Sequence, residues 1–230
     1  MIGIMGAVNE ELELYIHNLS NSKKSTYSGF DFYSGTLGGK DVVVVKSGVG
    51  KVNSGICSQI LIDRFNASTV IFTGVAGALN PELEIEDLVI SKDCVQHDMD
   101  ATGLGFEKGQ IPFTELRFFK ASERLRKLAL SAAKKTNLRA IDGRVLTGDQ
   151  FLTDKTKASD IKDEFNGDCV DMEGAAMAQV CTLNDVPFLV IKSISDKADH
   201  SAEINFNKFC KTAAKNSFMI VNEIIKELEM

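Results

Sequence analysis

The sequence lacks the features that nucleic-acid-binding and membrane-spanning proteins need. Its 26 Lys and Arg residues are outnumbered by 32 Asp and Glu residues, and the formal net charge is −6. The longest basic cluster is the pair Lys134-Lys135. Binding to a phosphate backbone requires clustered cations, which argues against a nucleic-acid partner. The uncharged stretch from residue 65 to residue 81 is short and contains Asn, Ser, Thr and Gly, so we expect no membrane span.

Cysteine pairs and a basic leader are also missing. The five cysteines are widely spaced and include no CxxC pair. This spacing predicts buried thiols in a reducing compartment rather than a disulfide framework. No basic residue precedes Lys23, and the chain becomes acidic at Glu10-Glu11, which is not the pattern of a secretory signal. We therefore expect a cytoplasmic protein.

Proline is scarce, with three residues in all, and no repeat, low-complexity tract or linker interrupts the sequence. Hydrophobic residues make up 44% and charged residues 25%, as in ordinary globular proteins. These features predict one domain over residues 1–230.

Short apolar runs alternate with longer helical stretches. Strands are expected at Ile2–Met5, Phe30–Leu37, Val42–Lys46, Thr69–Thr73, Leu88–Cys94, Arg139–Thr147, Asp168–Val170 and Phe188–Ile194. Helices are expected from a cap at Asn9 to Leu19, at Lys51–Phe65, after a cap at Ser122, at Met172–Thr182 and at Phe206–Leu228. The alternation predicts an α/β fold with a mixed, mostly parallel central sheet flanked by helices. Gly38-Gly39 predicts a hairpin within it.

Two glycine-rich segments invite nucleotide-binding interpretations that the sequence does not support. The first, residues 47–51, has Val45 where a P-loop needs Gly and Val52 where Mg²⁺ coordination needs Ser or Thr. It is better explained as a strand-to-helix turn that lets the backbone approach a neighbour or a ligand. The second, residues 73–78, lacks the GxGxxG spacing of a dinucleotide loop. It is either a small-residue wall against a planar ligand or a tightly packed segment.

The run His97-Asp98-Met99-Asp100 could belong to a metal site. Such a site needs three or four ligands from several elements, and His17 and His200 are the other imidazoles. We interpret the run as a hydrogen-bonded structural cluster. The sequence has no GxSxG motif and no cysteine beside a histidine, so nucleophilic catalysis has no support. We expect neither a metal nor another cofactor.

Acidic residues recur where strands are expected to end. Glu11 lies in the first turn of a helix, where the helix dipole favours a carboxylate, Asp171 and Glu173 follow one apolar strand, and Asp196 follows another. Ligands of α/β sheets bind beyond the carboxyl ends of the strands. Each acid alone could be a helix cap or a surface carboxylate. Together they predict a site in which paired carboxylates divide acid and base work.

An ordered series of motifs resembles the 5′-methylthioadenosine/S-adenosylhomocysteine nucleosidases of the purine nucleoside phosphorylase superfamily. The resemblance runs from the first strand to the final helix. Its motifs are Ile2–Ala7 with Glu10-Glu11, Lys46–Val52, Thr73–Gly77, His97-Asp98 with Asp100, Gly109–Pro112, Gly148–Phe151, Val170–Ala175, Val186–Phe188, and Ser193–Asp196 ahead of Phe206.

The resemblance implies a nucleoside phosphorylase/hydrolase-like fold and hydrolysis of the N-glycosidic bond of those nucleosides, which releases adenine in methionine salvage. Glu11 is similar to the base that orients water toward the anomeric carbon. Asp196, held by Ser195, is similar to the acid that protonates the purine. An oxocarbenium-like transition state fits this arrangement, as in an inverting glycosidase.

The resemblance also implies the residues that bind the substrate. Glu173, beside Met172, would bind the ribose hydroxyls. Phe151 and Leu152 would contact adenine, and Phe206 would line the sugar and alkylthio pocket. Asp171, Val75, Ala76 and Gly77 complete the expected binding set. In relatives the loop around Phe106 and Pro112 reaches into the neighbouring subunit's site, so a homodimer is implied.

Three positions depart from the family pattern. Asp171 stands where the family has Glu, so its side chain is one methylene shorter. Val75 stands where many relatives have Ser, which removes a hydroxyl near the nucleoside. Lys192 replaces a frequent Arg and loses planar bidentate pairing.

Two alternatives remain open at this point. A phosphorolytic nucleoside phosphorylase would need arginines near the first loop and beside the Thr73 strand, where this chain has Glu11 and no arginine. The second alternative is a nucleoside-binding protein that kept the fold and lost catalysis. Methylthioadenosine, S-adenosylhomocysteine, 5′-deoxyadenosine and aminodeoxyfutalosine all share the adenosine core, so the sequence fits each of them.

Overall fold

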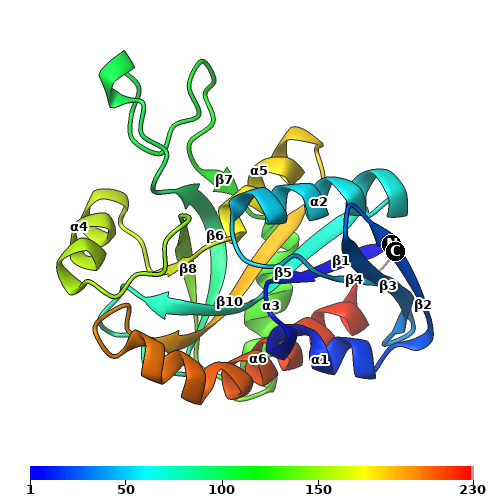
Figure 1. Cartoon of the computed structure of the whole chain (residues 1–230). Coiled ribbons are helices and arrows are strands. Elements are labelled where there is room, and N and C mark those ends of the chain that lie inside the picture. Colours follow the sequence, from blue (N-terminus) through cyan, green and yellow to red (C-terminus); the bar gives the residue numbers. More distant parts are fainter. Residues whose placement is uncertain (229–230) are drawn as a thin grey trace.

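A ten-stranded sheet runs through the centre of the structure, with helices on both of its faces (Figure 1). The computed structural model describes residues 1–228. The strands are β1 (Ile2–Gly6), β2 (Ser20–Tyr27), β3 (Phe30–Leu37), β4 (Lys40–Lys46), β5 (Thr69–Ala78), β6 (Leu88–Gln96), β7 (Phe119–Lys120), β8 (Ala140–Thr147), β9 (Cys169–Asp171) and β10 (Phe188–Asp196). The helices are α1 (Asn9–His17), α2 (Lys51–Phe65), α3 (Glu123–Lys135), α4 (Lys155–Phe165), α5 (Gly174–Leu183) and α6 (Ala202–Glu227), with a 3₁₀ turn, η1 (Thr102–Leu104).

The sheet has a parallel centre and closes into a ring on one side. Strand β1 pairs in parallel with β4 and β5, and β5 pairs in parallel with β10. Strands β3 and β2 extend the β4 side as antiparallel neighbours. On the other side, β10 pairs with β6, β6 with β8, β8 with β9, and β9 returns to β5. This confirms the predicted α/β fold with a mixed sheet, and it gathers the ends of β5, β9 and β10 in one place.

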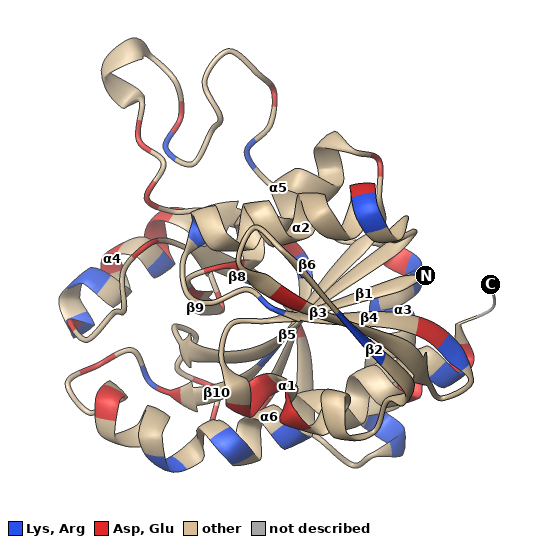
Figure 2. Ribbon diagram, turned by 45° about the vertical axis from the view of Figure 1, so that its right-hand side comes forward, with Lys and Arg blue, Asp and Glu red and all other residues tan. Residues whose placement is uncertain are grey.

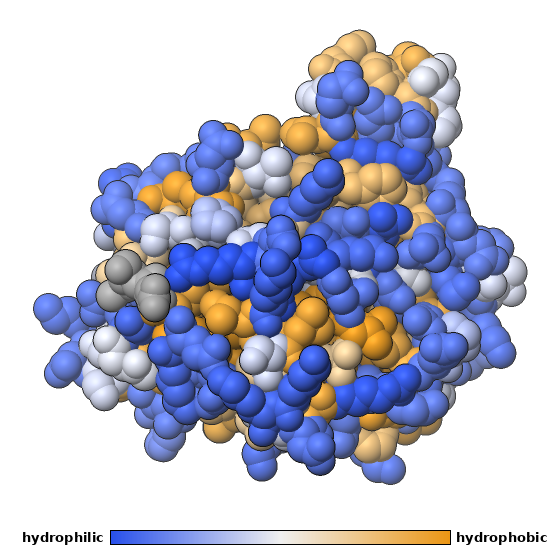
Figure 3. All heavy atoms as spheres, turned by 180° about the vertical axis from the view of Figure 1, so that it is seen from behind, coloured by the Kyte–Doolittle hydropathy of each residue, from blue (hydrophilic) through white to orange (hydrophobic). Residues whose placement is uncertain are grey.

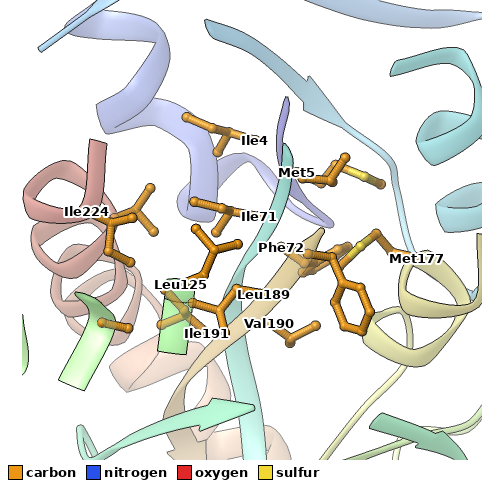
Figure 4. Close-up of a cluster of buried hydrophobic side chains, with 14 of the residues drawn as sticks. Ile4, Met5, Ile71, Phe72, Leu125, Met177, Leu189, Val190, Ile191 and Ile224 are labelled. Carbon is orange, nitrogen blue, oxygen red and sulfur yellow. The ribbon is translucent and has the colours of Figure 1, made fainter. Parts of the chain in front are cut away.

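The apolar runs of the central strands are buried on both faces, as their continuous hydrophobicity predicts. Helices α1, α3 and α6 cover one face and α2 and α5 the other (Figure 1). In Figure 4, Ile71 lies toward Leu125 and Ile224, whereas the next residue of the strand, Phe72, points toward Met177. Successive strand residues alternate between faces, so one strand anchors both helical layers.

Two central strands reach further than the sequence predicts. Strand β5 continues to Ala78 and β10 to Asp196, beyond the predicted ends at Thr73 and Ile194. The two strands pair in parallel along this extension as far as Gly77. The predicted ends were too early because both strands keep a hydrogen-bonded neighbour beyond them, and glycine permits a close approach of backbones. The acid at the end of β10 therefore lies on a strand.

The start of α1 also differs from the prediction. Asn9 is the first helical residue rather than the cap, and its side-chain oxygen accepts a hydrogen bond from Lys46 at 2.9 Å. The carboxylate of Glu11 instead accepts from the backbone N–H groups of Ala7 and Val8. The candidate base thus satisfies the free donors of its own helix start.

Other boundaries were missed for identifiable reasons. Strand β2 reads SNSKKSTY and is exposed along most of its length, so it has no apolar alternation. Strand β7 has two residues. Helix α5 begins at Gly174 rather than Met172, and α6 begins at Ala202 rather than Phe206. Helix α4 has a cap at Asp154, whose side chain accepts from two backbone N–H groups.

Charged residues lie mainly on the outer helices and loops (Figure 2). The segment between β6 and β7 projects from the body (Figure 1), and apolar side chains show at its tip (Figure 3). Leu104 is 71% exposed there and Phe113 84% exposed. All five cysteines are buried free thiols, as predicted. Within residues 1–228, every helix is too short or too polar to cross a bilayer.

Candidate active site

A cavity of about 440 Å³ opens where β1, β5, β9 and β10 end. Its lining comprises Ala7, Val8, Glu11, Val49, Val75, Ala76, Gly77, Gln150, Phe151, Leu152, Val170, Asp171, Met172, Glu173, Ser195, Asp196, Ala198, Glu203 and Phe206. The candidate acid, base and binding residues that are expected to come from the same subunit all lie in this lining, although they belong to distant segments of the sequence. The fold therefore brings them together, and their chemical roles remain predictions.

Glu11 is held at the cavity wall by three backbone N–H groups. One carboxylate oxygen accepts from Ala7 at 2.6 Å and Val8 at 3.1 Å, and the other accepts from Val75 at 2.9 Å. Burial raises the pKa of Glu11, while the charge of Lys192 and these three hydrogen bonds oppose the shift. The pKa of this carboxylate is raised, and its Oε1 accepts one hydrogen bond only from the described residues. It can therefore accept a proton from water.

The position of Glu11 depends on a glycine beside it. A Cβ atom at Gly74 would lie 2.1 Å from Oε1 of Glu11 and 2.5 Å from its Cδ. These distances are far inside van der Waals contact, so any side chain at this position displaces the carboxylate. Gly74 therefore gives the candidate base its space, and the next three residues of β5, Val75–Gly77, line the cavity.

Asp196 lies at the end of β10 with two hydrogen-bond donors. Its Oδ2 accepts from the hydroxyl of Ser195 at 2.8 Å, and its Oδ1 accepts from the N–H of Ala198 at 2.9 Å. Burial raises the pKa of Asp196, and the two donors oppose the shift. A carboxyl whose pKa is raised by burial retains a proton for transfer to a leaving group more readily than an exposed one.

Asp171 and Glu173 line the inner end of the cavity, and Lys192 lies behind them. The ammonium of Lys192 is 1% exposed and lies 2.8 Å from Oδ2 of Asp171. Asp171 also accepts from the hydroxyl of Thr147 at 2.5 Å and from the N–H of Gly174 at 2.9 Å. The shortened side chain at 171 therefore has a full set of partners, and the cation at 192 is one of them.

Lys192 and the two buried glutamates, Glu11 and Glu173, also shift one another's pKa values through their charges. Burial works against its ammonium, but the charges of Asp171, Glu11 and Glu173 outweigh burial and raise the pKa of Lys192. Burial raises the pKa of Glu173 to about 8, and the charge of Lys192 opposes that shift. One cation thus favours ionisation of several buried carboxyls, which otherwise hold their protons.

Three segments around the cavity are joined by a polar network, which we call the Lys51 clamp. The ammonium of Lys51 lies 2.6 Å from Oδ1 of Asp98, and its backbone N–H donates to Asp149 at 2.8 Å. The N–H of Asp149 donates to the other oxygen of Asp98 at 3.0 Å. One residue before the clamp, the N–H of Gly50 donates to Glu173 at 2.9 Å. The clamp fixes the start of the segment that carries Phe151.

The acidic members of the predicted cluster at residues 97–100 are hydrogen-bonded, as predicted. Asp98 belongs to the Lys51 clamp, and Asp100 accepts from Thr102. The ring of His97 differs, because its buried Nε2 has no hydrogen-bond partner within residues 1–228. Burial lowers the pKa of His97.

Aromatic side chains flank the open side of the cavity. The rings of Phe151 and Phe206 meet edge to face with centroids 6.1 Å apart. Leu152 also lines the cavity and is buried in a small hydrophobic cluster of its own. Phe106 and Pro112 do not line the cavity. They belong to the projecting segment, where the ring of Phe106 packs on that of Phe113 at 5.1 Å.

Sequence reasoning missed several lining residues. Val8, Val49 and Gln150 lie within or beside motifs that the sequence singled out, so the motifs marked the segments but not these contacts. Glu203 had no signal, because it lies in the first turn of α6, which starts four residues before the predicted start.

The mixed sheet and this cavity define an α/β protein of the phosphorylase superfamily, and the chain belongs to that family, whose sequence model matches residues 1–226. It is 40% identical to a 5′-methylthioadenosine/S-adenosylhomocysteine nucleosidase of Halalkalibacterium halodurans, over 99% of this chain and 98% of that protein. It is 37% identical to an aminodeoxyfutalosine nucleosidase of Campylobacter jejuni, over 99% of both chains.

A solved structure has nearly the same fold. The 5′-methylthioadenosine/S-adenosylhomocysteine nucleosidase from Neisseria meningitidis, in complex with methylthio-immucillin-A, is similar to this chain with a TM-score of 0.96 and 36% sequence identity, over 99% of each chain. The family resemblance that the motifs predict is thereby confirmed.

Proposed function

We propose that this protein hydrolyses the N-glycosidic bond of 5′-methylthioadenosine and S-adenosylhomocysteine, releasing adenine and the 5′-thio-ribose product. One observation carries the proposal. Every lining side chain that can ionise is a carboxyl group, namely that of Glu11, Asp171, Glu173, Asp196 and Glu203. An acid-lined cavity stabilises the positive charge that develops on ribose as the bond to adenine breaks.

Glu11 is the proposed general base. It removes a proton from water as the water oxygen bonds to the anomeric carbon, and it is held for this role by three backbone N–H groups. Asp196 is the proposed general acid. It gives its proton to a purine ring nitrogen as the bond between that carbon and adenine breaks, so the electron pair leaves with neutral adenine.

The remaining lining residues are proposed to hold the substrate. One oxygen of Glu173 is bound by the N–H of Gly50, which leaves the other for the ribose hydroxyls. Phe151 and Leu152 contact adenine, and Phe206 lies beside the sugar and its 5′ group. Met172, Asp171 and Ser195, with Val75, Ala76 and Gly77, complete the walls.

Water rather than phosphate is the proposed nucleophile. No Lys or Arg of the described residues lines the cavity, and Lys192 is held behind it by Asp171. A phosphate dianion near Glu11 would meet carboxylates without a compensating cation, which is unfavourable at short range.

A homodimer is proposed as the working assembly. The support is the exposed apolar tip of the projecting segment, with Leu104 at 71% and Phe113 at 84% exposure. In this proposal Phe106 and Pro112 reach the partner's cavity. A cytoplasmic location is also proposed, because five buried free thiols suit a reducing compartment.

The test is adenine release from four nucleosides, with and without phosphate. These are methylthioadenosine, S-adenosylhomocysteine, 5′-deoxyadenosine and aminodeoxyfutalosine, the last because a relative with 37% identity is an aminodeoxyfutalosine nucleosidase. We expect release from the first two at a rate independent of phosphate. A rate that rises with phosphate, with ribose-1-phosphate as product, would overturn hydrolysis.

Two variants separate an enzyme from a binding protein. Glu11→Gln and Asp196→Asn each remove one proton-transfer group, and we expect each to lower kcat by about 10²- to 10⁴-fold. Glu10→Gln is the matched control, because Glu10 is an exposed neighbour outside the lining. A wild-type protein that binds adenosine analogues but releases no adenine would support the binding-protein alternative instead.

A further inference from the structure

One acid in the cavity lining takes no part in the proposed proton transfers or substrate contacts. Glu11, Glu173 and Asp196 are all buried, whereas Glu203 is exposed although it lines the same cavity. A side chain that is both lining and exposed lies at the rim. Glu203 therefore marks the mouth, on the side where α6 begins.

The neighbours of Glu203 indicate which part of a substrate would meet it. Residues three apart on a helix lie on the same face, so Glu203 lies beside Phe206. Phe206 also lines the cavity and contacts the ring of Phe151 at 6.1 Å. The buried acids occupy the inner end, where ribose and adenine are proposed to bind. The group that extends from the sugar toward solvent then passes Phe206 and reaches Glu203.

The charge of Glu203 is not neutralised by the protein. Within residues 1–228 its carboxylate makes no hydrogen bond or ion pair, and the cavity lining contains no Lys or Arg. Several other charged side chains on the outside of the fold are paired, as Lys108 is with Glu164. A free carboxylate at the mouth attracts a cation and repels an anion.

We propose that Glu203 is a specificity-determining residue that favours nucleosides whose 5′ substituent carries an ammonium group. The inference rests on the proposed nucleosidase function and names its substrate class more closely. S-adenosylhomocysteine carries such an ammonium beside a carboxylate on the same carbon, methylthioadenosine is neutral at this end, and aminodeoxyfutalosine carries a carboxylate without an ammonium. Glu203 thus selects among substrates that share the adenosine core.

The test uses three 5′-thioadenosines with side chains of equal length that end in an ammonium, a methyl or a carboxylate group. The enzyme is compared with Glu203→Gln and with Glu203→Lys. An ion pair at an exposed position changes binding by about two- to five-fold. We therefore expect Glu203→Gln to lower kcat/KM for the ammonium compound by about that factor, to leave the methyl compound unchanged and to improve the carboxylate compound. Glu203→Lys should invert the order.

Glu13→Gln is the control, since Glu13 is another exposed acid in a helix but does not line the cavity. The selectivity should also weaken between low and high salt, because mobile ions screen exposed charges. Equal changes for the three compounds, or none, would refute the role of Glu203.

Calorimetric binding of the same three compounds measures the charge preference without turnover. Charge-dependent binding without adenine release would contradict the proposed function but support the role of Glu203. Adenine release from all three compounds with no charge preference in either assay would support the proposed function but contradict the role of Glu203.

Discussion

Replacing Lys192 by Met should reveal how the buried charges stabilise the protein. Lys192 is 1% exposed and lies 2.8 Å from Asp171, which is equally buried. Methionine has a similar length and no charge, so the substitution keeps most of the packing. It leaves Asp171 and the two nearby glutamates without a cation, and removing one partner of a buried ion pair costs about 3–5 kcal/mol.

The loss has a ceiling that depends on pH. A buried carboxylate without a partner takes up a proton instead of remaining charged. Neutralising an ordinary aspartate, with a free-peptide pKa of about 3.9, costs about 4 kcal/mol at pH 7 and about 1.5 kcal/mol at pH 5. For a chain of this size, 1 kcal/mol shifts Tm by about 2–4 °C. Lys192→Met should therefore lower Tm by at most roughly 8–16 °C at pH 7 and by at most roughly 3–6 °C at pH 5.

The assay is thermal unfolding followed by circular dichroism from pH 5 to pH 8, for the wild type and the variant. Lys108→Met is the control, because it breaks a half-exposed ion pair with Glu164 and should cost less than about 1 kcal/mol. Equal losses at pH 5 and pH 7, or a loss at pH 7 no larger than that of the control, would refute the argument that a buried cation balances these carboxyls.

Three further predictions concern the site. Gly74→Ala should displace Glu11 and lower kcat by about 10²-fold or more, whereas Gly55→Ala, whose Cβ would meet its nearest neighbour at 3.9 Å, should leave steady-state kinetics unchanged. Asp98→Asn leaves one amide oxygen for two donors, the ammonium of Lys51 and the N–H of Asp149, so the Lys51 clamp should loosen. KM should then rise by about 3- to 10-fold with a smaller change in kcat. Burial raises the pKa of Glu173 to about 8, so the contribution of Glu173 to stability is complete below about pH 4.5 and is lost as the pH rises toward 8. In thermal unfolding over this pH range, the Tm of Glu173→Gln should therefore fall less steeply than that of the wild type.

The sequence predicts the parts of the fold that depend on continuous apolar runs. Val42–Val45 and the runs in β5 and β10 are buried as expected, because their hydrophobicity requires cover on both faces. Strand β2 was missed because it is polar and exposed, and its pairing with β3 comes from the turn at Ser28 and Gly29 rather than from burial. Such an edge strand has no pattern of its own.

Helix α4 shows a signal that could have been read. Asp154 caps it, and Ala158, Ile161 and Phe165 recur at three- and four-residue steps on its buried face. The segment is short and otherwise highly charged, which hid that stripe. The Lys51 clamp could not be predicted in this way, because its three members lie on separate elements and are joined only when the sheet closes.

The departures at positions 171 and 192 are best understood as one feature. Considered separately, each departure suggests a weakened contact. Aspartate is shorter than glutamate, and the lysine ammonium lacks the planar, bidentate geometry of an arginine guanidinium. In the fold they are partners, with the flexible ammonium of Lys192 meeting the short carboxylate of Asp171 at 2.8 Å. Both also act on the candidate site, since Asp171 accepts the N–H groups that start α5 and Lys192 favours ionisation of Glu11 and Glu173. A short acid and a lysine can therefore form a buried ion pair that acts on the candidate site, because the two side chains meet each other.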